Sequence, residues 1–274
     1  MLRINDISFS IDGKPLFERA SAVIPKGHKV GIVGRNGTGK TTLFRLIHKE
    51  WSLDSGSIEY PVHFRVGGVE QEAPSNNVSL LDTVLAADVE YASLNTEAET
   101  ATDPMRIAEI YERLSEINAH SAESRAATIL AGLGFDNKAQ IRSCAEFSGG
   151  WRMRVALGSV LFSQPDLLLL DEPTNYLDLE GSAWLESFLA KYGQTVLVIS
   201  HDRGLLNRSV TGILHLNNLK LRYQTGGYDQ FDYERRLRLE QQLATKKKQD
   251  EQRAHIQSFV DRFRYKASKA RQAQ

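Results

Sequence analysis

Gly34-Arg35-Asn36-Gly37-Thr38-Gly39-Lys40-Thr41 fits the pattern GxxxxGK[ST], which is typical of a loop that wraps the phosphates of a nucleoside triphosphate. Its glycines let the backbone turn tightly and point successive N–H groups at a phosphate. The alternative is a glycine-rich turn without a ligand. The flanking patterns favour the phosphate loop, because residues 29–33 predict a buried strand before it and residues 42–47 predict a helix after it.

The chemistry of this loop predicts a triphosphate and a divalent cation. Lys40 reaches the β- and γ-phosphates as a point charge, and the Thr41 hydroxyl is a ligand for Mg²⁺. The start of the following helix adds the positive end of its dipole. We therefore expect a nucleotide to bind at Gly34, Asn36, Gly37, Thr38, Gly39, Lys40, Thr41 and Thr42.

Two adjacent carboxylates end the most apolar run of the chain. Residues 167–170 are four leucines, which predicts a strand buried on both faces, and Asp171 and Glu172 follow directly. Ligands of open α/β sheets bind at the carboxyl ends of parallel strands. We expect Asp171 to hold Mg²⁺ and Glu172 to polarise an attacking water.

Two further motifs are open to more than one interpretation. Ser148 stands before Gly149 and Gly150 at the start of a predicted helix. It is either an ordinary N-cap or part of a phosphate contact, since two glycines weaken a helix start unless a ligand approaches the backbone. His201 follows the buried strand 195–200 and is either structural or a neighbour of the two carboxylates.

Composition limits the classes of protein that fit. The chain has 274 residues, 41% of them hydrophobic, which suffices for one large domain with an appendage. Its single cysteine, Cys144, excludes a disulfide framework and favours a reducing compartment. No apolar run has the length of a membrane span, and no secretory leader pattern opens the sequence. We expect a cytoplasmic protein without membrane insertion.

A net charge of zero conceals two segments of opposite sign. Residues 88–124 contain nine acidic and two basic side chains, a net charge of −7. Residues 233–274 contain twelve basic and five acidic side chains, a net charge of +7. A polyanionic partner is therefore plausible for the tail and disfavoured for the acidic segment.

Strand and helix patterns outline the rest of the chain. Residues 2–10 alternate and meet Asp12-Gly13, which predicts a hairpin. Two short strands are expected over 55–60 and 62–69, the second ending near Gln71. From residue 80 to residue 135 the apolar spacing is helical, and the acidic segment within it predicts a helical hairpin that stands off the core.

The motifs follow one another in an order that resembles a known family. The phosphate loop, Gln71, the Ser148 motif, the Asp171-Glu172 pair and His201 resemble the nucleotide-binding domain of ATP-binding cassette proteins. The runs SGGWRMR, DEPTNYLD and SHDR resemble the ABC-F branch, soluble ATPases that carry two cassettes and act on the ribosome. This implies a P-loop NTPase of ABC type, an α/β fold with a mixed sheet core, an antiparallel β edge and a helical subdomain.

The resemblance also implies domain boundaries. Residues 1–228 would form the nucleotide-binding domain, with a helical subdomain and its short acidic arm-like insertion at about 79–145. Residues 229–274 are similar to the basic helical linker that joins the two cassettes of that branch. We expect this chain to be one part of a longer protein, with a second cassette, or a second copy of itself, as its partner.

Roles for individual residues follow from the same resemblance. Two cassettes pair head to tail, so that Ser148, Gly149 and Gly150 contact a nucleotide held by the other cassette. Glu172 would be the general base, Gln71 a sensor of Mg²⁺ and water, and His201 the contact to the γ-phosphate. Asp178 would communicate across the pair.

One position departs from the family pattern. Members of the family usually stack an aromatic residue on adenine in the turn before Lys14, where this chain has Ile11. Phe9 and Phe17 are the candidate replacements.

The basic tail predicts one helix, or two with a break near residues 246–248. Apolar residues recur in it at helical spacing, namely Ile256, Phe259, Val260 and Phe263. The tail is either a solvated coiled hairpin or a contact to the phosphate backbone of structured RNA. The resemblance favours ribosomal RNA or tRNA.

Two other classes share the cassette motifs. The ATP-binding subunit of a membrane transporter would need a separate transmembrane partner. A DNA-bound repair or chromosome ATPase would carry a far longer coiled-coil insertion than residues 79–145 provide.

Overall fold

The computed structural model describes residues 1–69, 75 and 77–272, with the backbone alone at residue 255 and at residues 258–272. The chain divides into two compact units, Met1–Tyr228 and Asp229–Gln274. Gln71, one of the predicted site residues, lies outside the described residues.

The first unit is built on a six-stranded sheet in the order β5-β6-β7-β3-β8-β9. Its strands are β3 (Lys29–Gly34), β5 (Val66–Gly68), β6 (Leu167–Asp171), β7 (Thr195–Ile199), β8 (Gly212–Asn217) and β9 (Lys220–Thr225). All pairs are parallel except β8 with β9. The four leucines of β6 and all of β7 are buried, as expected for parallel strands covered on both faces.

A second, antiparallel sheet has the order β2-β1-β4. Its strands are β1 (Leu2–Ile11), β2 (Lys14–Ile24) and β4 (Ser55–Glu59). Asp12 and Gly13 join β1 to β2 with positive φ angles of 49° and 75°, the turn geometry that suits a two-residue hairpin. The predicted hairpin and the predicted mixed sheet with an antiparallel edge are therefore both confirmed.

The strand expected over residues 62–69 is shorter than predicted. Only Val66–Gly68 pairs with β6. The Phe64 N–H bonds the Pro61 carbonyl at 2.9 Å and closes a turn, which leaves Val62 fully exposed.

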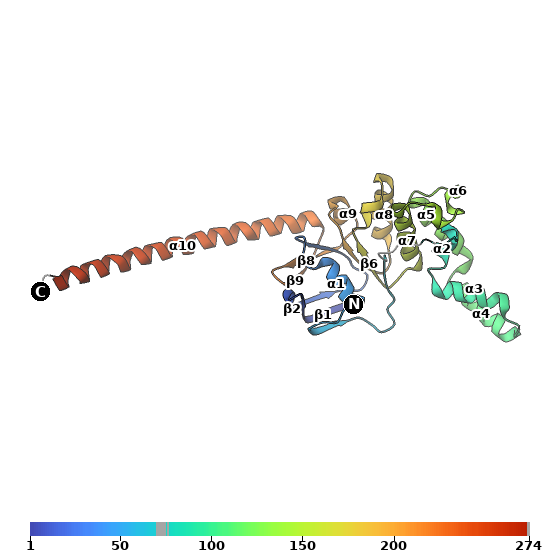
Figure 1. The fold of residues 1–274 in the computed structure, drawn as a ribbon, viewed down its shortest axis with the longest axis horizontal. Coiled ribbons are helices and arrows are strands. Elements are labelled where there is room, and N and C mark those ends of the chain that lie inside the picture. The colour runs from blue at the N-terminus through green and yellow to red at the C-terminus, as the bar shows by residue number, and fades with distance from the viewer. Residues whose placement is uncertain (70–74, 76, 273–274) are drawn as a thin grey trace. The chain divides into compact units, whose positions relative to one another are not determined.

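Helices complete the first unit. Three belong to the sheet region: α1 (Lys40–Ile47), α8 (Leu179–Lys191) and α9 (Arg203–Arg208). Four form a helical part beside the sheet, labelled in Figure 1: α2 (Leu80–Leu85), α5 (Ala122–Gly132), α6 (Asn137–Gln140) and α7 (Gly149–Ser163). Short 3₁₀ turns occupy Ala119–Ser121, Cys144–Glu146 and Pro173–Tyr176.

The acidic segment is a helical hairpin, as predicted, formed by α3 (Val89–Thr100) and α4 (Pro104–Glu116). It projects from the helical part and has a small core of its own around Leu94, Ile110 and Leu114. Asp88 and Asp103 cap the two helices by accepting hydrogen bonds from backbone N–H groups.

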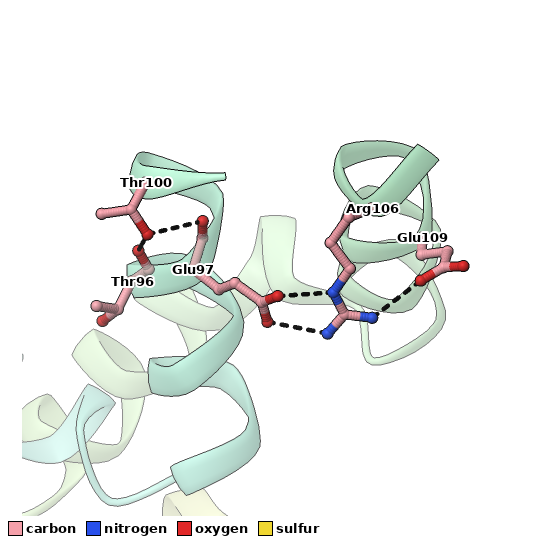
Figure 2. A network of polar contacts seen from close by, with 5 residues as sticks. All are labelled: Thr96, Glu97, Thr100, Arg106 and Glu109. Atoms are coloured by element: carbon pink, nitrogen blue, oxygen red, sulfur yellow. Dashed lines mark hydrogen bonds and ion pairs between the residues drawn. The ribbon is translucent and has the colours of Figure 1, made fainter. Parts of the chain in front are cut away.

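Arginines on α4 tie the hairpin together. Arg106 forms a two-bond fork with the Glu97 carboxylate on α3, at 2.6 and 2.9 Å, and also donates to Glu109 on its own helix (Figure 2). Arg113 repeats the arrangement by joining Glu90 of α3 to Glu116. Both networks are solvent-exposed.

The described residues of the second unit all lie in one helix, α10, which spans Tyr228–Gln272 without a break at residues 246–248. Salt bridges at i,i+4 spacing, such as Arg238 with Glu234, support its first turns. Leu237, Leu243 and Ile256 are exposed on it. Among the described residues, no helix combines the length and the apolar composition that a bilayer crossing needs.

Candidate active site

The glycine loop joins β3 to α1 in the strand, loop, helix arrangement that its motif requires. Gly37 and Gly39 have φ angles of +78° and +95°, a region that side chains disfavour. A Cβ at Gly39 would lie 3.2 Å from the Phe17 ring, whereas a Cβ at Gly37 would meet open space. Packing against Phe17 therefore favours glycine at position 39, whereas Gly37 leaves the backbone accessible to a ligand.

The start of α1 is suited to an anion. Gly39 is its N-cap and, as a glycine, has no side chain that could bond the first N–H groups of the helix. Its first turn contains no acidic residue. These N–H groups and the helix dipole therefore present positive potential toward the loop.

Lys40 bonds only carbonyl oxygens of its own loop. Its Nζ donates to the Gly34 carbonyl at 3.1 Å and more weakly to the Arg35 carbonyl at 3.5 Å. No carboxylate of the described residues forms an ion pair with it within 4.0 Å. The charge of Lys40 is therefore available to a phosphate.

Thr41 and Asp171 meet across the loop. The Thr41 hydroxyl donates to the Asp171 carboxylate with an oxygen-to-oxygen distance of 2.6 Å. Hydroxyl and carboxylate oxygens are hard ligands that fit Mg²⁺. No group of three or more His, Cys, Asp or Glu side chains gathers for a metal in the described part of the chain. The site thus suits an ion that completes its shell with water and phosphate oxygens.

Glu172 and His201 lie side by side because β6 and β7 are neighbours with Asp171 opposite Ile199. The Glu172 carboxylate accepts a hydrogen bond from the His201 backbone N–H at 3.2 Å, and His201 Nε2 lies 3.4 Å from its other oxygen. Glu172 has φ 47° and ψ 52°, a left-handed conformation that is strained for this residue type. Such strain occurs at functional sites, where the surrounding structure holds it.

These side chains share one cleft of about 570 Å³. Its lining includes most of the residues predicted to bind nucleotide, namely Asn36, Gly37, Gly39, Lys40, Thr41, Thr42, Asp171, Glu172 and His201. Gly34 and Thr38 belong to the same loop but are not among the cleft lining, and Thr38 Oγ1 donates to the Arg35 carbonyl at 2.8 Å. The structure therefore brings the loop, both carboxylates and the histidine together.

The suggested aromatic replacements are wrong. Phe9 and Phe17 are both buried in the core, 8% and 2% exposed, and Phe9 stacks on Trp51. The cleft is instead lined near this turn by Ile11, Lys14 and Leu16. Sequence analysis missed this lining because the approach of β1 and β2 to the loop is a tertiary contact.

The Ser148 helix start lies apart from this cleft, since none of its residues is among the cleft lining. Ser148 is the N-cap of α7, yet its side chain makes no capping hydrogen bond. A Cβ at Gly149 would meet open space, and one at Gly150 would only touch the Tyr176 ring at 4.0 Å. Local packing therefore does not account for the glycines, which leave an open backbone surface at a helix N-terminus.

Asp178 begins α8 and also contacts the helical part. Its carboxylate accepts the Gly181 N–H at 2.9 Å, a bond that lowers the pKa of this carboxyl below its ordinary value. Arg154 of α7 donates to the same carboxylate at 3.2 Å. Sequence analysis quoted Arg154 only as part of a motif and gave it no role.

Comparisons with known proteins agree with this geometry. A family described as ABC transporter matches residues 17–175, and a second family with the same description matches residues 214–274. The chain is 44% identical to the "Probable ATP-binding protein YheS" of Haemophilus influenzae, over 100% of this chain and 43% of that protein. It is 41% identical to the human "ATP-binding cassette sub-family F member 3", over 100% of this chain and 39% of that protein.

Solved structures share the fold. An "ATP binding subunit of ABC transporter" superposes with a TM-score of 0.62 at 17% identity, over 82% of this chain and 90% of that one. A dimeric post-hydrolysis state of an ATP-binding cassette bound to ADP and Pi gives 0.59 at 19% identity, over 82% and 98%. The chain spans about two fifths of the length of the curated relatives it matches.

Proposed function

This chain belongs to the ATP-binding cassette family and, within it, to the ABC-F type, and on that premise we propose that it hydrolyses ATP and couples the reaction to pairing with a second cassette. The observation that supports hydrolysis best is the meeting of Lys40, Thr41, Asp171 and Glu172 at one cleft.

Each residue of the cleft has a proposed task. The loop N–H groups and Lys40 hold the β- and γ-phosphates, and Ile11 and Leu16 cover the base in place of an aromatic ring. Thr41 and Asp171 would hold Mg²⁺, which would supply positive charge to neutralise the phosphate oxygens. Glu172 accepts the proton of the attacking water, and His201, beside it, contacts the γ-phosphate. Gln71 is proposed to sense Mg²⁺ and water.

A second cassette supplies what the cleft lacks. The open backbone of Ser148, Gly149 and Gly150 does not line the chain's own cleft, which is the arrangement expected if it covers a nucleotide bound by the partner. The partner is either another cassette of the natural protein or a second copy of this chain.

ATP turnover by the natural full-length protein tests hydrolysis. Glu172→Gln keeps the shape of the side chain but removes the base, so turnover should fall by at least about 100-fold while ATP still binds. The matched control is Glu112→Gln in the α3–α4 hairpin, which should turn over ATP at the wild-type rate. Equal rates for wild type and Glu172→Gln would refute the assignment.

We further propose that residues 233–274 contact ribosomal RNA or tRNA. The supporting observations are the net charge of +7 and the helix α10, in which residues 239–254 are exposed. The acidic hairpin would face away from the phosphate backbone. This makes the protein a soluble, cytoplasmic translation factor whose closed, ATP-bound state engages the ribosome and whose hydrolysis releases it.

Ribosome co-sedimentation of the Glu172→Gln protein with ATP tests the partner. Pelleting that requires ATP, weakens as salt is raised and is lost without residues 233–274 would support RNA contact. A protein that stays in the supernatant under all conditions, and that instead co-purifies with membranes, would favour the alternative of a transporter subunit.

A further inference from the structure

We propose that Arg154 is a positioning residue that couples the Ser148-Gly149-Gly150 helix start to the Glu172 site of the same cassette. The inference rests on the proposed function, because it concerns how a nucleotide held by the partner cassette influences hydrolysis in this one.

Arg154 is the buried connection between two parts of the first unit. Its side chain is only 10% exposed. Nε donates to the Tyr176 carbonyl at 2.5 Å, and Nη1 donates to the Leu133 carbonyl at 3.1 Å and to Asp178 at 3.2 Å. The guanidinium also lies 4.2 Å from the centre of the Trp151 ring. Three acceptors from two separate segments, Leu133 on one and Tyr176 and Asp178 on the other, therefore hold one planar group.

Two of these acceptors belong to the segment that follows Glu172. Tyr176 ends the 3₁₀ turn Pro173–Tyr176, which begins at the residue after Glu172. The Asn175 N–H bonds the Glu172 carbonyl at 3.1 Å, so this turn is closed directly onto the glutamate. Displacement of the Tyr176 carbonyl therefore shifts the backbone of Glu172.

The other end of the connection is the helix start. Arg154 lies in the second turn of α7, and the Arg152 N–H bonds the Ser148 carbonyl at 2.9 Å. Helix α7 is thus continuous from Ser148 to Arg154. A phosphate that pulls on the N–H groups at the helix start moves Arg154 with it.

Arg154 should keep its three hydrogen-bond acceptors when the helix start moves, because breaking one of these bonds costs free energy. A buried guanidinium that loses an acceptor keeps its charge and has no water to replace the bond. Lysine cannot substitute for it, since a single ammonium group does not reach three acceptors spread around a plane. Movement of the helix start should therefore carry the 173–178 segment along.

The third acceptor fixes Arg154 to the helical part. Leu133 follows α5, and Gly134 next to it has φ +96° and lies where a Cβ would be 3.0 Å from Nη1. Arg154 therefore moves as part of the helical region and reaches out of it to the turn beside Glu172.

Steady-state ATP turnover by the natural full-length protein tests this role. Arg154→Met and Arg154→Lys should lower kcat by roughly tenfold to a hundredfold, the effect expected of a misplaced catalytic group, and leave the KM for ATP nearly unchanged. The matched control is Arg106→Met, which removes an arginine with the same number of hydrogen bonds from the hairpin. It should keep the wild-type kcat.

Chemical rescue separates positioning from folding. In Arg154→Ala, millimolar methylguanidinium can enter the space left by the side chain and should restore part of kcat, whereas Arg154→Met fills that space and should not respond. The unfolding midpoint of each variant is measured in parallel. A KM effect alone, or a lost kcat that follows the unfolding midpoint and is not rescued, would overturn the proposal.

ATP turnover by wild type and Glu172→Gln distinguishes failure of the proposed function from failure of the proposed role of Arg154. If these two turn over ATP equally, the proposed role of Glu172 as general base fails. If turnover depends on Glu172 but Arg154→Met and Arg154→Lys keep the wild-type kcat, hydrolysis stands and the role of Arg154 is refuted.

Discussion

Charged side chains gather at two places in the first unit, the cleft at the ends of β3 and β6 and the α3–α4 hairpin. In the hairpin, Arg106 and Arg113 each bind two carboxylates, one from either helix. In the cleft, Lys40 bonds carbonyl oxygens and Asp171 bonds a hydroxyl, although both carry full charges. Within the described residues Lys40 forms no ion pair with Asp171 or Glu172. The ring nitrogen of His201 lies 3.4 Å from the Glu172 carboxylate.

This difference separates charges that serve the fold from charges kept for a ligand. An arginine fork closed by carboxylates is satisfied and has little to offer a further partner. A lysine held by two loop carbonyls keeps its net charge, and a phosphate can replace those carbonyls at small cost. Substitutions in the cleft should therefore weaken ATP binding and leave stability unchanged. Substitutions in the hairpin should reduce stability and leave ATP binding unchanged.

Among the substitutions that compare these two regions, Lys40→Met should have the largest effect. Loss of a charge-assisted contact to the phosphates should weaken ATP binding by about tenfold to a hundredfold, while the unfolding midpoint stays close to that of the wild type. Titration with a fluorescent ATP analogue measures the affinity. Lys29→Met is the control, since Lys29 also donates to a backbone carbonyl, that of Gly27, at the other end of β3. Unchanged ATP affinity in Lys40→Met would show that the charge of Lys40 is not kept for a ligand, and the cleft would then not differ from the hairpin in this respect.

A smaller effect, on the stability of the hairpin and not on ATP binding, is expected from Arg106→Met. The fork between α3 and α4 is lost, so amide hydrogen exchange in both helices should rise a few-fold, as for other exposed ion-pair networks. ATP affinity should not change. Arg142→Met serves as the control, because Arg142 pairs with Glu146 within one turn and joins no two helices. Faster exchange in that variant as well would show that the fork has no special part in holding the hairpin.

The smallest effect is a pH dependence within the hairpin. The hydrogen bonds from Arg106 lower the pKa of Glu97 below its ordinary value of 4.5. A lowered pKa means that the stabilisation is complete above pH 4.5 and is lost as the pH falls through the folded pKa. Carbon-13 NMR titration of the Glu97 carboxylate should give a value below 4.5, and Arg106→Met should return it toward 4.5. Arg113→Met should leave it unchanged, and an unshifted wild-type value would contradict the fork.

Local patterns were enough to predict much of the fold and the position of the phosphate loop. Glycine spacing and the buried runs before Gly34 and Asp171 depend on neighbouring residues only, so they can be read along the chain. The cassette family was predicted from motif order and the ABC-F type from the runs SGGWRMR, DEPTNYLD and SHDR, and both predictions are confirmed by the comparisons. The roles of Gln71, Ser148, Glu172 and His201 stay predictions.

Tertiary contacts account for what the sequence did not reveal. Phe9 and Phe17 were suggested for adenine, but the β1–β2 register places them opposite each other, both facing the core. A one-residue change of register would turn each ring to the other face, and alternation alone does not decide between the two. The arginine networks also depend on contacts between segments that are 9 and 23 residues apart in the hairpin and 21 to 24 residues apart at Arg154.

Two of the three acceptors of Arg154 are main-chain oxygens, those of Leu133 and Tyr176. A carbonyl group is present whichever amino acid occupies the position, so most replacements at 133 and 176 preserve these hydrogen bonds. Only the guanidinium itself has no equivalent among the other side chains. Residues 133 and 176 can therefore vary in evolution while Arg154 stays fixed. A library of variants under selection for ATP turnover should tolerate many amino acids at 133 and 176 but retain arginine at 154.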